Sequence, residues 1–246
     1  MDRMLFIAMN GARQTMAAQA INSNNLANAS TTGFKSDFQN SLSQRVYGPG
    51  LSSRVYATVE NAGVDLAQGS IVSTGRDLDV AVNGKGWIAV QAADGSEAYT
   101  RAGDLKVDNL GRLTNGAGYM ILGDGGPISV PENAKLDIGG DGTISVLPIG
   151  QPVNSLATVD RIKLVNPPDN LMIKGTDGLM HMKGGGRASA DASVQLVSGS
   201  LESSNVNTVS TLVRMIELAR QYETNIKLMK TAEDTDRASA QIVKMS

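Results

Sequence analysis

Both ends of this 246-residue chain carry the apolar spacing of an amphipathic helix, and this constrains the fold more than any other feature. In residues 207–246, alternate steps of three and four residues meet Leu212, Met215, Ala219, Tyr222, Ile226, Met229, Ala240 and Val243, interrupted by Glu233 and Asp236. In residues 1–28 a similar stripe is formed by Leu5, Met9, Ala12, Met16 and Leu26, interrupted by Gln19 and Ser23. A helix cannot bury such a stripe against itself. We therefore expect the two terminal helices to pack on each other as a coiled-coil-like pair.

The two helices differ in charge. Asp2, Arg3 and Arg13 are the only charged residues in 1–28, where the other polar side chains are amides and hydroxyls. A solvated helix face normally carries more charge, and neutral side chains form hydrogen bonds to neighbours without desolvating ions. We expect the first helix to be enclosed by protein on most sides. An ordinary helical hairpin that caps one domain is the plainer alternative, and the many asparagines of this helix weigh against it.

Between the helices the apolar period changes from that of a helix to two, which is typical of strands. Glycine, aspartate, asparagine and proline form turn signals between the strand-like segments. The expected strands lie within residues 54–60, 78–82, 87–90, 105–107, 119–122, 144–147, 161–165 and 194–197. This order of elements predicts an α+β fold with a central, mostly antiparallel β-domain. Two similar segments, residues 69–74 and 199–204, are expected to lie side by side as the entry to that domain and the exit from it.

The same signals divide the chain into consecutive parts. The first is an N-terminal axial helix with a turn after it, and the last is a C-terminal axial helix. We expect the connector after the first helix to be part helical and part extended, with a break at Gly48-Pro49-Gly50. The predicted parts are residues 1–35 (helix and turn), 36–75 (connector), 76–195 (β-domain), 196–206 (return connector) and 207–246 (helix).

Composition argues against several classes of protein. The net charge is −2 and the 22 Lys and Arg residues form no cluster, so a nucleic-acid partner is not expected. Without cysteine the chain has no disulfide framework and no thiol chemistry, although this does not fix its compartment. No apolar run reaches the length of a membrane span, and residues 1–20 lack the features of a cleavable secretory signal. If the chain leaves the cytoplasm, we expect another route to carry it.

Catalytic and cofactor sites have little support in the sequence. His181 is the only histidine, and without a cysteine or second histidine it has no partner for a zinc site. Residues 84–89 match part of a dinucleotide fingerprint, but a strand follows where the phosphate-binding helix should begin. We therefore expect no catalytic residues, cofactor or metal. A hydrolase that uses two carboxylates far apart in sequence stays open as an alternative.

Three motifs along the chain resemble those of the bacterial flagellar rod and hook proteins. The first combines Asn25-Leu26-Ala27-Asn28 with Thr-Gly-Phe-Lys at residues 32–35. We call residues 32–35 the signature turn. The second is residues 78–87 together with Tyr99-Thr100-Arg101-Ala102-Gly103. The third is residues 204–207 followed by Met215-Ile216, Arg220, Tyr222-Glu223 and Asn225. Together these motifs cover the whole chain, and their combination is highly specific.

The resemblance implies a structural subunit of the flagellar rod, and the short length and first residues look most like a proximal-rod protein. A distal-rod protein is the nearest alternative within the family. The resemblance also implies export through the flagellar type III apparatus and assembly in the periplasm with other rod proteins and with copies of the chain. The terminal helices would form the inner tube and be mobile before assembly. From another class, a secreted oligomeric β-domain that binds carbohydrate or a receptor remains possible.

On this interpretation the functional residues lie at an assembly interface rather than in a catalytic site. The expected interface residues are Leu5, Met9, Met16, Asn24, Asn25, Leu26 and Asn28 in the first helix, and Ile216, Tyr222, Ile226 and Met229 in the last. In the signature turn, Gly33 is suited to a positive φ. We expect Phe34 to anchor the departing chain in an apolar pocket.

Overall fold

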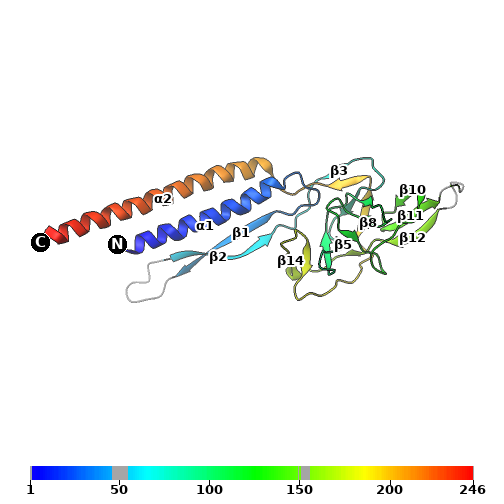
Figure 1. The fold of residues 1–246 in the computed structure, drawn as a ribbon, viewed down its shortest axis with the longest axis horizontal. Helices are drawn as coiled ribbons and strands as arrows, with labels where there is room; N and C mark the ends of the chain where they lie inside the picture. The colour runs from blue at the N-terminus through cyan, green and yellow to red at the C-terminus, as the bar shows by residue number, and fades with distance from the viewer. Residues whose placement is uncertain (1, 46–54, 149, 151–155, 246) are drawn as a thin grey trace. The chain divides into compact units, whose positions relative to one another are not determined.

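The computed structural model describes residues 2–45, 55–148, 150 and 156–245, and the chain divides into two compact units (Figure 1). The first, which we call the helical unit, contains residues 1–29, 36–65 and 206–246. The second, the β-unit, contains residues 30–35 and 66–205. The signature turn therefore belongs to the β-unit although it follows the first helix directly.

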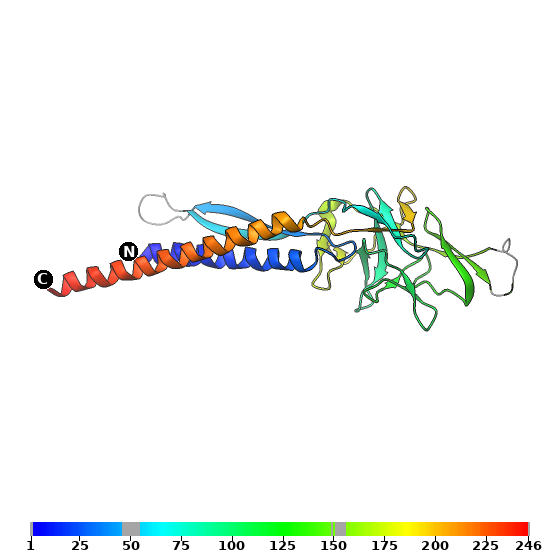
Figure 2. The same ribbon diagram turned by 90° about the horizontal axis from the view of Figure 1, so that it is seen from above.

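The helical unit consists of α1 (Asp2–Ala27), α2 (Thr208–Met245), β1 (Asp37–Arg45) and β2 (Val55–Val64). The two terminal helices pack on each other as predicted, and α1 also contacts the β1–β2 hairpin, as Figures 1 and 2 show. Asn207 caps the start of α2, because its side-chain oxygen accepts the backbone N–H of Ser210 over 3.0 Å. Both predicted terminal helices are confirmed.

The connector after α1 differs from the sequence-based expectation. Its extended part is confirmed by the antiparallel β1–β2 pair, which runs from Asp37 opposite Val64 to Arg45 opposite Val55. The expected helical part is wrong for the described residues, which form the hairpin instead. Hairpin pairing satisfies the backbone groups that each strand directs toward the other, and β-branched valines are suited to it. The predicted break at residues 48–50 lies outside the described residues.

The β-unit is built from short strands. Its strands are β3 (Ile71–Ser73), β4 (Val80–Asn83), β5 (Trp87–Gln91), β6 (Glu97–Thr100), β7 (Lys106–Val107), β8 (Leu113–Thr114), β9 (Met120–Ile121), β10 (Asn133–Ile138), β11 (Thr143–Pro148), β12 (Ala157–Arg161), β13 (Leu164–Val165), β14 (Met172–Lys174), β15 (Met180–Met182), β16 (Gln195–Ser198) and β17 (Ser200–Glu202), with a 3-10 helix at Asp169–Leu171. The largest sheet has the order β14-β15-β6-β5-β9-β8-β7, with β13 also paired to β5. Strands β10, β11 and β12 form a second sheet.

Every strand pair that the structure describes is antiparallel, which confirms the predicted arrangement of the β-domain. The predicted neighbouring segments are also confirmed, because β3 pairs with β17 and places Ser73 opposite Ser200. The core is made by apolar residues that alternate along the strands. Ile88, Leu113, Ile121, Ile144 and Ile162 are among its fully buried members.

Aspartate side chains close the predicted turns. After β5, Gly95 has a φ of +83°, and Ser96 donates both its backbone N–H and its hydroxyl to Asp94 Oδ1. The hydrogen bond from the Ser96 side chain lowers the pKa of Asp94 below its ordinary value. The turn between β10 and β11 repeats this arrangement with Asp141 and Thr143. These local bonds explain why the aspartate–glycine pairs in the sequence are reliable turn signals.

Candidate assembly surfaces

The face of α1 that packs against the rest of the helical unit is made of small and amide side chains. Its buried residues are Ala8, Ala12, Thr15, Asn22 and Asn25. These residues are spaced four, three, seven and three positions apart, so they lie along one side of the helix. The predicted stripe shares only Ala12 with these buried residues. Leu5, Met9 and Met16 of that stripe are 38%, 51% and 56% exposed.

The packed face of α2 shares only part of its predicted stripe. Thr211, Leu218 and Ala232 are buried, and Met215, Tyr222, Asn225 and Met229 are half-buried between them. The predicted stripe therefore had Met215, Tyr222 and Met229 on the correct face. By contrast, Leu212, Ile216 and Ile226 are 48%, 56% and 41% exposed. The observed stripe runs alongside the predicted one, with Thr211 and Asn225 in place of Leu212 and Ile226 but Leu218 beside Ala219.

Close approach of the helices explains this choice of face. A Cβ atom placed on Gly11 would lie 3.1 Å from Asn225 Oδ1, which leaves room for glycine but little for a larger residue. The Asn225 side-chain amide lies 3.5 Å from Thr15 Oγ1, and Asn22 donates to the Thr211 carbonyl over 2.8 Å. Helices that approach closely satisfy buried polar groups across the contact, so amides are accommodated where leucine would be too large.

Many large apolar side chains of both helices nevertheless face outward. The exposed large apolar residues are Leu5, Phe6, Ile7, Met9 and Met16 in α1 and Val209, Leu212, Val213, Ile216, Ile226 and Leu228 in α2. A single exposed leucine is ordinary on a protein surface, but series of exposed apolar residues along a helix mark contact surfaces. Of the predicted interface residues, Leu5, Met9, Met16, Ile216 and Ile226 belong to this set.

Four of the other predicted interface residues lie at the end of α1, whereas Tyr222 and Met229 lie half-buried on the packed face of α2. Asn24 is exposed, Leu26 is half-buried, and half-buried Asn28 donates its side-chain amide to the Asn24 carbonyl over 3.0 Å. Asn25 is buried and binds the backbone of Asp37 twice, donating to its carbonyl over 2.7 Å and accepting its N–H over 2.9 Å. Asn25 therefore fixes the start of β1 against α1 within a single subunit.

The signature turn adopts the conformation expected at its glycine. Gly33 has a φ of +67°, which confirms the predicted left-handed position. A Cβ atom there would lie 2.3 Å from the backbone carbonyl carbon of Arg101, so a side chain is excluded by space as well as by conformation. Phe34 is half-buried, and its ring lies 4.0 Å from the ammonium of Lys174. The surroundings of Phe34 therefore include a cation on its aromatic face, which the expected apolar pocket did not anticipate.

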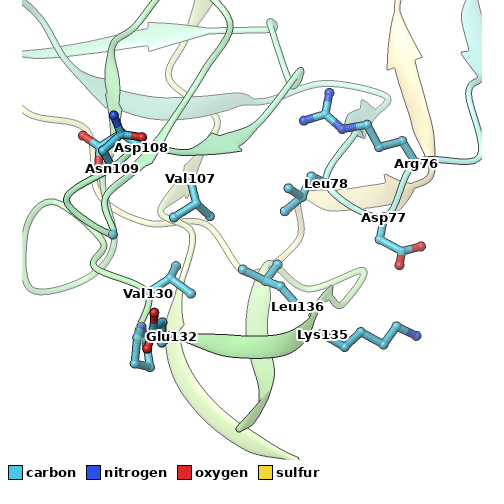
Figure 3. Close-up of a pocket in the computed structure, with 12 residues that line it drawn as sticks. Arg76, Asp77, Leu78, Val107, Asp108, Asn109, Val130, Glu132, Lys135 and Leu136 are labelled. Carbon is cyan, nitrogen blue, oxygen red and sulfur yellow. The ribbon is translucent and has the colours of Figure 1, made fainter. Parts of the chain in front are cut away.

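The β-unit also has a surface groove of about 610 Å³ (Figure 3). Leu78, Val107, Val130 and Leu136 form its apolar lining. Charged residues of both signs surround this lining, namely Arg76, Asp77, Asp108, Glu132 and Lys135. With an apolar lining and mixed charges, the groove presents no single strong charge.

Groups that could perform other chemistry are sparse in the described residues. His181 Nε2 lies 3.0 Å from a carboxylate oxygen of Asp177, whose Oδ1 also accepts the backbone N–H of Leu179 over 3.0 Å. In the part of the chain that the structure describes, no cluster of three or more His, Cys, Asp or Glu side chains could hold a metal ion. None of the described helices is long and apolar enough to cross a membrane.

Comparison with known proteins gives matches along the whole chain. Residues 5–35 match the family model of the flagella basal body rod protein, residues 81–146 that of the flagellar hook protein FlgE/F/G D1 domain, and residues 197–242 that of the flagellar basal body rod FlgEFG protein C-terminal region. The chain is 40% identical to the flagellar basal-body rod protein FlgF of Escherichia coli (strain K12), with all of both chains covered. The chain belongs to the flagellar basal-body rod protein family. The resemblance seen in the sequence motifs is thereby confirmed.

Other members of the rod protein family give the same result. FlgF of Salmonella typhimurium is 39% identical over the whole of both chains. The rod protein FlgG of Bacillus subtilis is 30% identical over 95% of this chain and 96% of its own length. The match over residues 5–35 spans most of α1 and the signature turn, and the match over 197–242 spans β17 and most of α2. The family models therefore cover most of both terminal helices, which carry the exposed apolar side chains.

Proposed function

We propose that this chain is a structural, non-enzymatic subunit of the proximal rod of the bacterial flagellar basal body, and that it assembles helically into the shaft that transmits torque. Its partners are copies of itself and the other rod proteins. It reaches the periplasm through the flagellar type III export apparatus, without a cleavable signal peptide.

The observation that carries this proposal is the series of large apolar side chains that the terminal helices leave exposed. Small and amide residues such as Ala8, Ala12 and Asn22 are buried within the chain, whereas Met9, Met16 and Ile216 face outward. Fully burying one such large apolar side chain contributes about 1.5–3 kcal/mol, so several of them provide a strong driving force for association. A subunit that only had to pair its own two helices would gain by burying the larger side chains instead.

Helical assembly requires heterologous contacts, in which one face of a subunit meets a different face of the next. The exposed residues of α1 and α2 differ, so the chain presents two distinct faces that such a contact could join. Heterologous contacts that do not close into a ring generate open helical filaments. The proposed interface comprises Leu5, Met9, Met16, Asn24, Leu26, Asn28, Ile216 and Ile226. Tyr222 and Met229 belong to the packed face of α2 and, with Asn25, Gly33 and Phe34, shape the subunit that presents this interface.

The choice of proximal over distal rod rests on the relatives. The FlgF proteins of Escherichia coli and Salmonella typhimurium are 40% and 39% identical over whole chains. The FlgG proteins of Buchnera aphidicola (Schizaphis graminum) and Bacillus subtilis are 34% and 30% identical with lower coverage. The higher identity and full coverage support the proximal-rod proposal, with the distal rod as the alternative position.

The test is the substitution Ile226→Asp in a flagellated strain that lacks its own copy of the gene. Ile226 is exposed in the single chain, so the variant should fold, while a buried carboxylate at the interface should abolish rod assembly and swimming. Thr231→Asp is the matched control, because it adds the same charge at an exposed position of α2 that is already polar. Normal swimming of the Ile226→Asp strain, with the variant present in isolated basal bodies, would contradict the proposal.

A further inference from the structure

A buried charged cluster in the β-unit joins segments that are far apart in sequence. Glu202, at the end of β17, is fully buried, and Lys35 and Arg101 are 3% and 4% exposed. Lys35 Nζ lies 2.6 Å from Glu202 Oε1, and Arg101 Nη1 lies 2.9 Å from Glu202 Oε2. One carboxylate therefore receives a cation from the signature turn and another from the segment after β6.

Backbone groups complete the surroundings of the same carboxylate. Gly69 donates its N–H to Glu202 Oε1 over 3.0 Å, and Lys35 also donates to the Ala67 carbonyl over 2.7 Å. Arg101 donates to the Gly84 carbonyl over 2.8 Å, and its guanidinium carbon lies 5.2 Å from the centre of the Trp87 ring. Carboxylates buried with charged donors form strong hydrogen bonds, because water does not compete for them.

The backbone of the signature turn is bound at the same place. Gly33 donates its N–H to the Glu202 carbonyl over 2.8 Å, and Asn205 donates its own to the Phe34 carbonyl over 3.3 Å. On the other side, Lys174 Nζ donates to the Lys35 carbonyl over 2.8 Å. Residues 33–35 are thus held by the return segment 202–205 and by β14, while Lys35 and Glu202 also bind residues 67 and 69.

We propose that Glu202 is the centre of a clasp that fixes the signature turn, the entry segment 67–69 and the return segment 202–205 to the β-unit. The clasp holds together the chain segments that follow α1 and precede α2 in sequence. It closes only when Lys35 and Glu202, which are 167 residues apart, are both in place. The inference concerns the β-unit alone and does not depend on the proposed rod function.

If Glu202 holds these segments, their local unfolding should be independent of the terminal helices and of the apolar core of the β-unit. The outward faces of α1 and α2 lack partners within the described chain, so amides near the ends of these helices should exchange readily with solvent in the monomer. The amides of residues 33–35 should be protected in the same molecule. Their protection should depend on Lys35 rather than on pairing of the helices.

The test is hydrogen–deuterium exchange on the full-length chain carrying Lys35→Met, with Lys163→Met as its matched control. Lys163 forms a comparable ion pair with Glu97 over 2.8 Å, and their side chains are 16% and 6% exposed. It lies outside the three segments that the clasp joins. Lys35→Met should speed exchange in residues 33–35 and 67–69 by about ten- to a hundredfold and leave β5 and β6 protected. Lys163→Met should leave residues 33–35 as protected as in the wild type.

A second variant tests the clasp by changing its carboxylate, Glu202, instead of its lysine. Glu202→Gln leaves two buried cations without their carboxylate, and it should release residues 33–35 to limited proteolysis as well as to exchange. If Glu202→Gln unfolds the whole chain, the test rests on exchange at residues 33–35 in the Lys35→Met variant alone. Unchanged exchange at residues 33–35 in Lys35→Met, or an equal increase throughout β5 and β6, would overturn the clasp.

Discussion

The Asn22 side chain donates its amide to the backbone carbonyl of Thr211 over 2.8 Å, and both residues are buried between the terminal helices. This bond joins residues that are 189 positions apart in the sequence. A buried polar pair is satisfied only in one alignment of the helices, so it favours a single register over alternatives that would bury the amide without a partner. Large apolar side chains in the same place would fix the register less strictly.

Asn25→Ala should destabilise the helical unit, because Asn25 satisfies both the N–H and the carbonyl of Asp37. Removing a buried hydrogen-bonding partner costs about 1–3 kcal/mol, and the loss should appear in the free energy of unfolding and in faster exchange at the start of β1. Asn24→Ala is the control, since Asn24 is exposed and the substitution changes helix propensity equally. Equal effects of the two substitutions would show that the contact with Asp37 contributes nothing.

Substitutions at two adjacent residues of α1 should distinguish an effect on folding from an effect on assembly. Ala8 is buried and Met9 is exposed, so glutamine at each position probes opposite faces of the helix. Ala8→Gln should overpack the contact, costing about 1–3 kcal/mol, and lower the temperature at which the helical circular dichroism signal is lost. Met9→Gln should leave that temperature unchanged but impair swimming in the complemented strain. The reverse pattern would mean that the assignment of the two faces is wrong.

Sequence periodicity predicted where the helices and strands lie better than it predicted which face of each terminal helix is buried. The terminal helices and strands such as β5 and β11 follow from apolar spacing that depends only on local geometry. Most of the packed face of α1 did not follow, because Ala8, Thr15 and Asn22 rank low in hydrophobicity although they are buried. Small residues and asparagines at one side of a helix with few charges were the available signal.

The contacts that join distant segments could not be predicted from spacing. Lys35, Arg101 and Glu202 lie in three different segments, and none belongs to a periodic pattern that pairs them. Strand β6 was missed for a related reason, since Glu97 and Thr100 at its ends interrupt the apolar alternation. By contrast, β3 and β17 were paired correctly because their sequences resemble each other.

Tyr99 should make the β-unit lose stability in alkaline solution. The side chain is fully buried, its hydroxyl donates to Glu97 Oε1 over 2.9 Å, and it accepts the N–H of Ala188 over 2.7 Å. Burial, with a further contribution from Glu97, raises the pKa of Tyr99 to about 12, whereas an unfolded tyrosine ionises near pH 10. Between these values the unfolded chain has lost the proton that the folded chain keeps. The contribution of Tyr99 to stability is therefore complete below about pH 10 and is lost as the pH rises to about 12.

The measurement is the free energy of urea unfolding across that alkaline range, for the wild type and for Tyr99→Phe. The variant should be less stable at neutral pH, because the buried N–H of Ala188 loses its acceptor. It should nevertheless lose less stability than the wild type as the pH rises, since lysines and other tyrosines titrate equally in both proteins. Parallel curves for the wild type and Tyr99→Phe would contradict a raised pKa at Tyr99.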